Sequence, residues 1–226
     1  MGSAIQPNCL TVQGELESAL KKLNIKEKTI FSGRTDKDVH ASKQVVSVAI
    51  PSFWEDTKKL QTTLQNIINP YIRILSIKKV PNDFHARFSA IKREYRYIIS
   101  TKKLTPFQKA YLHYKKDIDI GKLKEASNHL LGKRDFEYFS KTGSDPHTTI
   151  RTIYAINIYK YKDFVVIKFQ ANAYLRSQIR MMVDFLLKIS NGELSFEDLQ
   201  NQINKKIMVS NKLAPASGLY LSKIIY

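Results

Sequence analysis

Hydrophobic positions along the chain recur with two spacings, one typical of amphipathic helices and one typical of strands. The segment 12–23 has the helical spacing, and Thr11 before it is a plausible N-cap. The same pattern predicts helices over 57–68, 120–131 and 175–189. Residues that stop or start helices stand near these segments.

Pro70 follows the second helical pattern, because proline cannot continue a helix. Gly132 is expected as the C-cap of the third predicted helix, and Gly192 is expected to stop the fourth. Ser195 and Asp198 form a capping-box signal, which predicts one more short helix.

Runs rich in β-branched and aromatic residues predict the strands. The predicted strands cover residues 29–32, 44–50, 73–80, 94–100, 151–159, 164–171 and 219–226. A looser basic stretch, 101–116, connects two parts of the chain that both alternate helix and strand without a visible sequence repeat. This order predicts two α+β halves around antiparallel sheets, 1–103 and 104–226.

Charge adds a partner to this picture. Among the 226 residues are 37 Lys and Arg against 20 Asp and Glu, a formal net charge of +17. Such an excess is typical of proteins that neutralise phosphates, so we expect a nucleic acid partner. A basic, merely solvated surface is the alternative interpretation.

Cysteine and histidine usage excludes other classes. Cys9 is the only cysteine, so no intrachain disulfide can form, which suits a reducing cytosol. The five histidines lack zinc-ligand spacing. No apolar run has transmembrane length and no signal peptide is visible, so we expect a cytoplasmic protein without a metal or a membrane association.

The richest candidate for chemistry is the polar loop 33–41, which precedes a predicted strand. Asp36 is either a turn-capping acid or a catalytic carboxylate. Arg34 stands two residues away and could contact a phosphate or a displaced base. We expect His40 to be a turn or core histidine.

A second candidate region, 84–97, interleaves aromatic residues with Arg87, Arg93 and Arg96. Bases stack on aromatic faces while arginines hold phosphates, so this pattern is typical of RNA binding. Strand alternation gives the other interpretation: Tyr95 and Tyr97 share one face, with Arg96 on the opposite face.

A third candidate region is 172–183, whose apolar positions are expected in the core. Arg176 and Arg180 are four residues apart, so they would share one face of a helix. If that face met the loop of Asp36, an arginine would keep the acid ionised and oriented. Two solvated arginines are the alternative.

Taken together, these segments resemble the tRNA pseudouridine synthases of the TruA type over nearly the whole chain. The most specific match is GRTD at 33–36 with VHA at 39–41, and FHARFSA at 84–90 with YRY at 95–97 adds independent weight. The other matching segments are TVQGELE at 11–17, REYRYII at 93–99, LGKRDFEYF at 131–139, RTI at 151–153, NAYLRSQIR at 172–180 and GLYL at 218–221.

The resemblance implies an isomerase that converts uridine to pseudouridine in the anticodon arm of tRNA, at positions 38 to 40. It implies no cofactor and no metal, and a homodimer whose two subunits contact one tRNA. The fold it implies is α+β, with two pseudo-symmetric ferredoxin-like (RRM-like) halves whose antiparallel sheets form a central catalytic cleft.

By the same resemblance, Asp36 matches the essential aspartate and Tyr95 the tyrosine that stacks on the flipped uracil. Arg180 matches the basic residue that pairs with the aspartate, and Arg34 the arginine that displaces the target base. Arg87, Arg93, Arg96 and Arg176 are further candidates for RNA binding. The carboxylate could attack C1′ or C6 or remove the C2′ proton, and the sequence leaves these routes open.

Two departures from the family pattern affect this expectation. The first strand of the family, ending in YDG, is missing before Met1, which predicts a destabilised N-terminal half. Asp38 stands where the family favours glycine, so it predicts modest backbone strain and a second carboxylate near Asp36 that would raise the pKa of one of them. A non-catalytic tRNA-binding or RNA-chaperone protein is therefore the alternative function.

Overall fold

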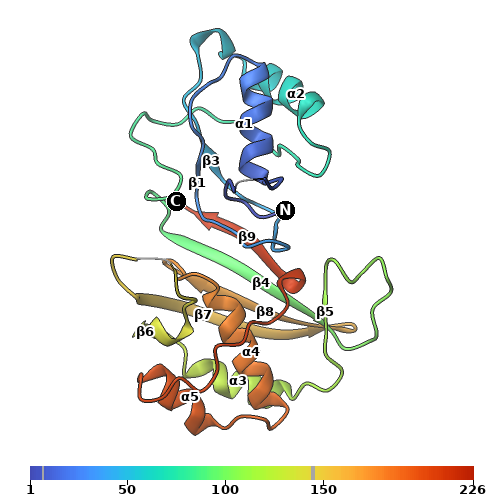
Figure 1. The fold of residues 1–226 in the computed structure, drawn as a ribbon, viewed down its shortest axis with the longest axis vertical. Coiled ribbons are helices and arrows are strands. Elements are labelled where there is room, and N and C mark those ends of the chain that lie inside the picture. The colour runs from blue at the N-terminus through green and yellow to red at the C-terminus, as the bar shows by residue number, and fades with distance from the viewer. Residues whose placement is uncertain (7, 144–145) are drawn as a thin grey trace. The chain divides into compact units, whose positions relative to one another are not determined.

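The computed structural model describes residues 1–6, 8–143 and 146–226, and its chain divides into two compact units (Figure 1). Unit 1 comprises Met1–Lys37 and Gln44–Ala90, and unit 2 comprises Asp38–Lys43 and Ile91–Tyr226. The chain therefore enters unit 2 for six residues directly after Lys37 and returns. The main change of unit falls after Ala90, and the predicted boundary between two halves at 103/104 stays a prediction.

Unit 1 is built on two helices, α1 (Val12–Lys22) and α2 (Thr57–Ile67). As predicted, the Thr11 hydroxyl caps α1 by accepting a hydrogen bond from the backbone N–H of Gly14. The apolar faces of the helices share one core, whose buried members are Leu16, Ala19, Leu20, Ile25, Leu60, Leu64 and Ile68.

Regular strand pairing in unit 1 is short. The strands β1 (Ile30–Phe31) and β3 (Val46–Ser47) pair antiparallel, within the two segments predicted as strands. A 3-10 turn, η1 (Ser52–Trp54), precedes α2.

The predicted strand over 73–80 is wrong, because side chains of α2 take the place of a neighbouring strand. Gln61 Nε2 donates to the carbonyl oxygens of Ile74 and Leu75, both at 3.1 Å. Gln65 accepts from the N–H of Ile74 at 2.8 Å and donates to the oxygen of Ile72 at 3.2 Å. The segment 73–80 thus has the sequence pattern of a strand but does not belong to a sheet.

Unit 2 contains a seven-stranded sheet in the order β2-β9-β4-β8-β7-β6, with β5 beside β4, as counted over the described residues. Most neighbours pair antiparallel, while β2 with β9 and β4 with β5 pair parallel. The strands are β2 (His40–Ala41), β4 (Lys92–Ser100), β5 (His113–Tyr114), β6 (Gly132–Asp135), β7 (Ile150–Tyr161), β8 (Phe164–Ala171) and β9 (Leu219–Ile225).

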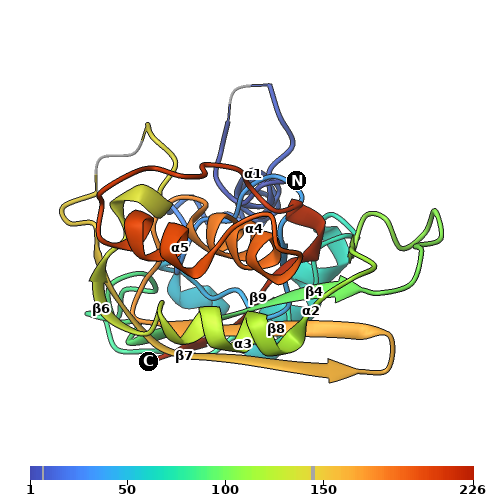
Figure 2. The ribbon, with the colours of Figure 1, turned by 90° about the horizontal axis from the view of Figure 1, so that it is seen from below.

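The helices of unit 2, α3 (Ile120–Asn128), α4 (Gln178–Ser190) and α5 (Phe196–Ile203), lie on one side of this sheet (Figures 1 and 2). The apolar sheet face, with Tyr97, Ile167 and Phe169 fully buried, belongs to one core with α3 and α4. Two short 3-10 turns, η2 (Glu137–Phe139) and η3 (Ala216–Gly218), complete the unit.

Two predicted helix ends in unit 2 are wrong, and one predicted start signal is confirmed. α3 ends at Asn128 with His129 as C-cap, and Gly132 (φ 89°) instead begins β6. α4 begins only at Gln178, because Ser177 before it has a left-handed backbone with φ 59°. Ser195 and Asp198 form the predicted capping box of α5.

The predicted fold class, α+β with antiparallel sheets, is confirmed. No helix within the described ranges is long and apolar enough to cross a membrane.

Candidate functional site

The loop of Asp36 is closed at its base in unit 1 by one glutamine. The Ser32 hydroxyl donates to Gln44 Oε1 at 2.5 Å, and Gln44 Nε2 donates to the Gly33 carbonyl at 2.9 Å. The N–H of Ser32 also donates to the Val45 carbonyl at 2.9 Å. These bonds hold the two ends of the loop together where it leaves and rejoins unit 1.

The N-terminal segment supports the same loop from the side. Ser3, which is 3% exposed, accepts a hydrogen bond from the N–H of Thr35 at 2.7 Å, and its own N–H donates to the Thr35 carbonyl at 3.1 Å. A Cβ on Gly2 would lie 3.3 Å from the backbone nitrogen of Lys37, tighter than most real contacts. Ser3 therefore fixes the backbone directly before Asp36, and Gly2 allows the N-terminal segment to approach the backbone directly after it.

Within the loop, Asp36 is half-buried and Arg34 is exposed. Asp38 has φ 65°, so the position does need the left-handed backbone that glycine adopts most easily. Aspartate tolerates this conformation better than most residues, and the expected strain at Asp38 is therefore modest.

After Asp38 the chain becomes part of the unit 2 sheet. Val39 is buried in the core of that unit, and β2 pairs parallel with β9 in the register His40 to Tyr220 and Ala41 to Leu221. On its other side β9 pairs with β4, where Leu221 lies opposite Tyr95. Ala41, five positions after Asp36, and Tyr95 therefore lie opposite the same residue, Leu221, from its two sides.

His40 is held between two tyrosines. Its ring stacks on Tyr220 with centroids 4.7 Å apart and on Tyr111 with centroids 5.3 Å apart. Its Nε2 lies 2.9 Å from the Ala110 carbonyl, which can only accept, so Nε2 is the donor. The Tyr220 hydroxyl donates to the Tyr111 carbonyl at 2.6 Å, which closes the arrangement. The expected structural role of His40 thus includes fixing the basic stretch 101–116.

Tyr95 and Tyr97 are both buried on one face of β4, and Arg96 is exposed on the other, as strand alternation predicts. Tyr95 is 7% exposed and meets the edge of the Tyr174 ring at 5.3 Å and 85°. Burial and then the neighbouring Tyr95 raise the pKa of Tyr174 well above its ordinary value. The phenol of Tyr174 is therefore protonated at physiological pH.

The opposite face of β4 carries a buried acid. Glu94 is 5% exposed and pairs with Lys168 at 3.0 Å and with Arg96 at 3.6 Å. The Ser222 hydroxyl donates to its backbone oxygen at 3.1 Å. The guanidinium of Arg96 is thus partly balanced by an acid of its own strand.

Arg176 and Arg180 do not share a helical face, which corrects the prediction from their spacing. Arg176 lies before α4, and its Nη1 donates to the carbonyls of Thr142 (2.9 Å) and Gly143 (3.3 Å). Arg180 lies in the first turn of α4, and its Nε donates to the Ala214 carbonyl at 2.8 Å. The left-handed Ser177 separates the two.

The two remaining predicted arginines lie in different units. Arg87 in unit 1 is exposed, with its guanidinium carbon 5.5 Å from the centroid of the Phe88 ring. Arg93 in unit 2 donates from Nη1 to the Asn172 carbonyl at 2.7 Å. Arg93, Tyr95 and Arg180 thus belong to unit 2, while Arg34, Asp36 and Arg87 belong to unit 1.

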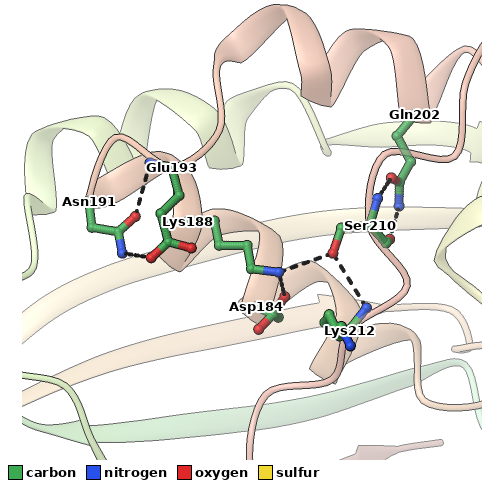
Figure 3. Close-up of polar contacts among 7 residues, drawn as sticks. All are labelled: Asp184, Lys188, Asn191, Glu193, Gln202, Ser210 and Lys212. Atoms are coloured by element: carbon green, nitrogen blue, oxygen red, sulfur yellow. Dashed lines mark hydrogen bonds and ion pairs between the residues drawn. The ribbon is translucent and has the colours of Figure 1, made fainter.

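The segment that contacts Arg180 is itself held by a polar network (Figure 3). Lys188 pairs with Asp184 at 2.8 Å and donates to the Ser210 hydroxyl at 3.2 Å. Gln202, 1% exposed, exchanges two hydrogen bonds with the backbone of Ser210, at 2.8 and 2.9 Å. Near this network lies an open hollow of about 380 Å³, and none of the predicted site residues lines it. We interpret the network as a support for the segment 210–214, which ends at the residue that accepts from Arg180.

The same segment orients Tyr97. Its hydroxyl donates to the Pro215 carbonyl at 2.8 Å, so the His113 Nδ1 at 3.1 Å must donate to the phenol oxygen. Burial raises the pKa of Tyr97, and burial followed by the charge of Lys115 lowers the pKa of His113. The protonated phenol and the neutral imidazole thus match their hydrogen bonds.

Sequence reasoning missed several residues of this region. Ser3, Gln44 and His113 carry no local signal, because each acts through a partner distant in the sequence. Tyr174 lies inside the motif NAYLRSQIR at 172–180, which was noted for its arginines. Its place in that motif was the available signal. No group of three or more His, Cys, Asp or Glu among the described residues is arranged to hold a metal ion.

Comparison with known proteins gives one consistent result. Residues 126–226 match the family described as tRNA pseudouridine synthase. The tRNA pseudouridine synthase A of Campylobacter jejuni subsp. jejuni serotype O:6 is 42% identical over 226 residues, which span 100% of this chain and 94% of that protein. The protein of the same name from Listeria monocytogenes serotype 4a is 39% identical over 236 aligned positions, 100% of this chain and 93% of that protein.

Among solved structures, a chain of a Cbf5–Nop10–Gar1 complex matches with a TM-score of 0.39 and 14% identity, over 84% of this chain and 44% of that chain. A likeness at that TM-score carries no weight. The full-length relatives show that the chain belongs to the tRNA pseudouridine synthases, a family of isomerases, as its motifs predicted.

Proposed function

We propose that this protein isomerises uridine to pseudouridine in the anticodon arm of tRNA, at positions 38 to 40, with Asp36 as the essential carboxylate. The observation that carries the proposal is the register of the unit 2 sheet. Residues 38–43 belong to unit 2, and within them β2 (His40–Ala41) is a strand of the sheet that also contains Tyr95. The loop and the tyrosine are thus linked through one hydrogen-bonded scaffold.

The proposed roles follow from the chemistry of each group. Breaking an N1–C1′ bond and forming a C5–C1′ bond needs a carboxylate that stays ionised, and Arg180 is the cation proposed to ensure this. The detached uracil must be retained, and Tyr95, rigidly packed against Tyr174, offers a ring for it to lie against. Arg34, exposed in the loop, is proposed to contact the displaced base or a phosphate.

The net charge of +17 supports RNA as the partner. Arg87, Arg93, Arg96 and Arg176 are proposed as further RNA contacts. A homodimer that contacts one tRNA with both subunits, a cytoplasmic location and chemistry without a cofactor complete the proposal, on the strength of the family and of the lone Cys9.

The test is to incubate the protein with an unmodified tRNA transcript and to map pseudouridine by position. Wild type should form pseudouridine at positions 38 to 40, and Asp36→Asn should form none above background. Asp38→Asn is the matched control: it also removes a carboxylate from the loop, and asparagine tolerates the φ of 65° found there. It should retain activity.

Equal product from wild type and Asp36→Asn would refute the role of Asp36. Product at other positions would refute the anticodon-arm assignment. Tight binding of tRNA by wild type without any product would favour the alternative, a non-catalytic RNA chaperone.

A further inference from the structure

Asn172, directly after β8, is bonded to both strands that flank β8. Its backbone oxygen accepts from Arg93 Nη1 on β4 at 2.7 Å. Its Oδ1 accepts from the N–H of Thr152 on β7 at 2.9 Å, and its own N–H donates to the Thr152 carbonyl at 3.1 Å. Since β8 lies between β4 and β7, these bonds hold residues 93 and 152 on either side of the end of β8.

Arg151, next to Thr152, has a fixed and incompletely satisfied guanidinium. Its Nη1 donates to the carbonyls of Thr148 at 2.8 Å and Ile150 at 2.6 Å. Its Nε is buried and has no hydrogen-bond partner among the residues that the structure describes. A buried N–H without an acceptor is costly, so the guanidinium is incompletely satisfied by the described residues, while the half-buried side chain as a whole still reaches the surface.

The neighbouring charge identifies the kind of acceptor. Burial, and after it the positive charge of Arg93, lower the pKa of Arg151. Two guanidinium groups close enough to repel are stabilised when an anion binds near both. Because Nε is covered, a phosphate would be bound from the outer side of the guanidinium, where arginine donates to phosphate oxygens.

The position is also appropriate for a substrate contact. Arg93 stands two residues before Tyr95 on β4, so their side chains leave the same face of the strand. A group bound by Arg93 and Arg151 would therefore lie on the same face of the sheet as Tyr95, the ring proposed to retain the uracil.

We propose that Arg151, together with Arg93, binds a backbone phosphate of the RNA substrate next to the target uridine. The inference rests on the proposed function for the identity of the RNA. It adds a binding residue, Arg151, to which neither the motif pattern nor the comparisons give a role.

The experiment measures the affinity of the full chain for unmodified tRNA over a range of salt concentrations. Arg151→Met should weaken binding about tenfold or more, because a charge-assisted hydrogen bond is lost. It should also lower the slope of log affinity against log salt by about one phosphate contact, roughly 0.7–0.9. Arg151→Lys retains the charge without the planar edge, so it should restore the slope but only part of the affinity.

Arg134→Met is the matched control. Arg134 is the partner of Arg151 in the β6–β7 register, and its Nε already donates to the Leu131 carbonyl at 3.0 Å. It removes the same charge from the paired strand and should leave both affinity and slope nearly unchanged. An equal effect of the two variants would reduce the finding to general electrostatics and overturn the proposal.

A double-mutant cycle identifies the phosphate. Transcripts carrying one neutral methylphosphonate at successive positions around the target uridine are bound to wild type and to Arg151→Met. One position should weaken wild-type binding and have no further effect on the variant. Additive losses at every position would overturn the proposal.

Unchanged affinity and slope with a lowered melting temperature would show that Arg151 only ties the carbonyls of its own loop. If Arg151→Met does not fold, Arg151→Lys decides, since unchanged affinity in that variant also overturns the proposal. Because affinity does not depend on turnover, a wild type that binds but forms no pseudouridine contradicts the proposed function and leaves this comparison valid.

Discussion

The two units hold their parts in place by different means. In unit 2, β4 pairs with β8 over eight successive residues and with β9 on its other edge, above a core in which Tyr97, Ile167 and Phe169 are fully buried. In unit 1, β1 and β3 pair over two residues, and glutamine side chains of α2 satisfy the backbone of 72–75. Local stability follows from such differences, so unit 1 should open more readily than unit 2.

The difference matters for the site, because the loop of Asp36 belongs to both units. Up to Lys37 it is fixed by single side chains, Ser3 and Gln44, and from Asp38 onward by strand pairing and by a buried Val39. Changes in unit 1 should therefore impair the proposed chemistry before they affect the sheet.

The largest effect is expected from truncating one core leucine in each unit. Leu60 in unit 1 and Leu123 in unit 2 are 2% and 0% exposed. Replacing either with alanine should lower the free energy of unfolding by about 2–5 kcal/mol. Hydrogen exchange should show Leu60→Ala opening α1 and α2 while amides of β4 and β8 stay protected. Equal loss of protection in both units would contradict the claim that unit 1 opens more readily than unit 2.

The next largest effect is expected from Ser3→Ala, because this substitution removes the hydroxyl that accepts the hydrogen bond of the Thr35 N–H. The expected cost is about 1–3 kcal/mol in unit 1. Pseudouridine formation should fall in addition, since the backbone before Asp36 loses its support. The control is Ser52→Ala at an exposed serine of the same unit, and a matching loss of activity there would contradict the argument.

The pH dependence of stability offers a smaller test in unit 2. Burial and the charge of Lys115 lower the pKa of His113, so the unfolded chain binds a proton more readily than the folded one. Stability should be complete above the unfolded pKa of about 6.5 and decrease as the pH falls through the lower, folded pKa. Urea unfolding between pH 5 and 8 should show this decrease, and His113→Gln should remove it.

His85→Gln, at a histidine of unit 1, is the control for that measurement and should keep the same decrease as wild type. A wild type that becomes more stable on acidification over this range would contradict the assignment to His113.

The smallest effect is expected at Asp38, where φ is 65°. Asp38→Gly relieves the strain but gives the unfolded chain more freedom, so the free energy of unfolding should change by less than about 1 kcal/mol. Asp38→Val should cost about 1–2 kcal/mol more, because a β-branched residue tolerates this conformation poorly. Equal melting temperatures for the two variants would show that the position is not strained.

The sequence was informative wherever structure is decided locally. Thr11 and Ser195 mark helix starts through bonds to their own neighbours, and Pro70 follows the end of α2 because proline cannot continue a helix. The β7–β8 hairpin follows from two adjacent apolar runs. The family motifs, likewise, were enough to predict the family that the full-length relatives show.

Where a distant partner decides, the sequence was insufficient. The apolar alternation of 73–80 indicates a strand, but the glutamines of α2 satisfy its backbone instead. The spacing of Arg176 and Arg180 indicates one helical face, but a left-handed Ser177 intervenes. The pairing of β2 with β9 joins residues about 180 positions apart, which no local pattern encodes.

That last pairing also sets an order of assembly. β9 follows β2 by about 180 residues, so β2 has no strand to pair with until β9 has been synthesised. The part of the loop after Asp38 can take its fixed form only from that point onward. A nascent chain therefore carries its candidate catalytic acid on an unfinished loop while everything between these two strands is being made.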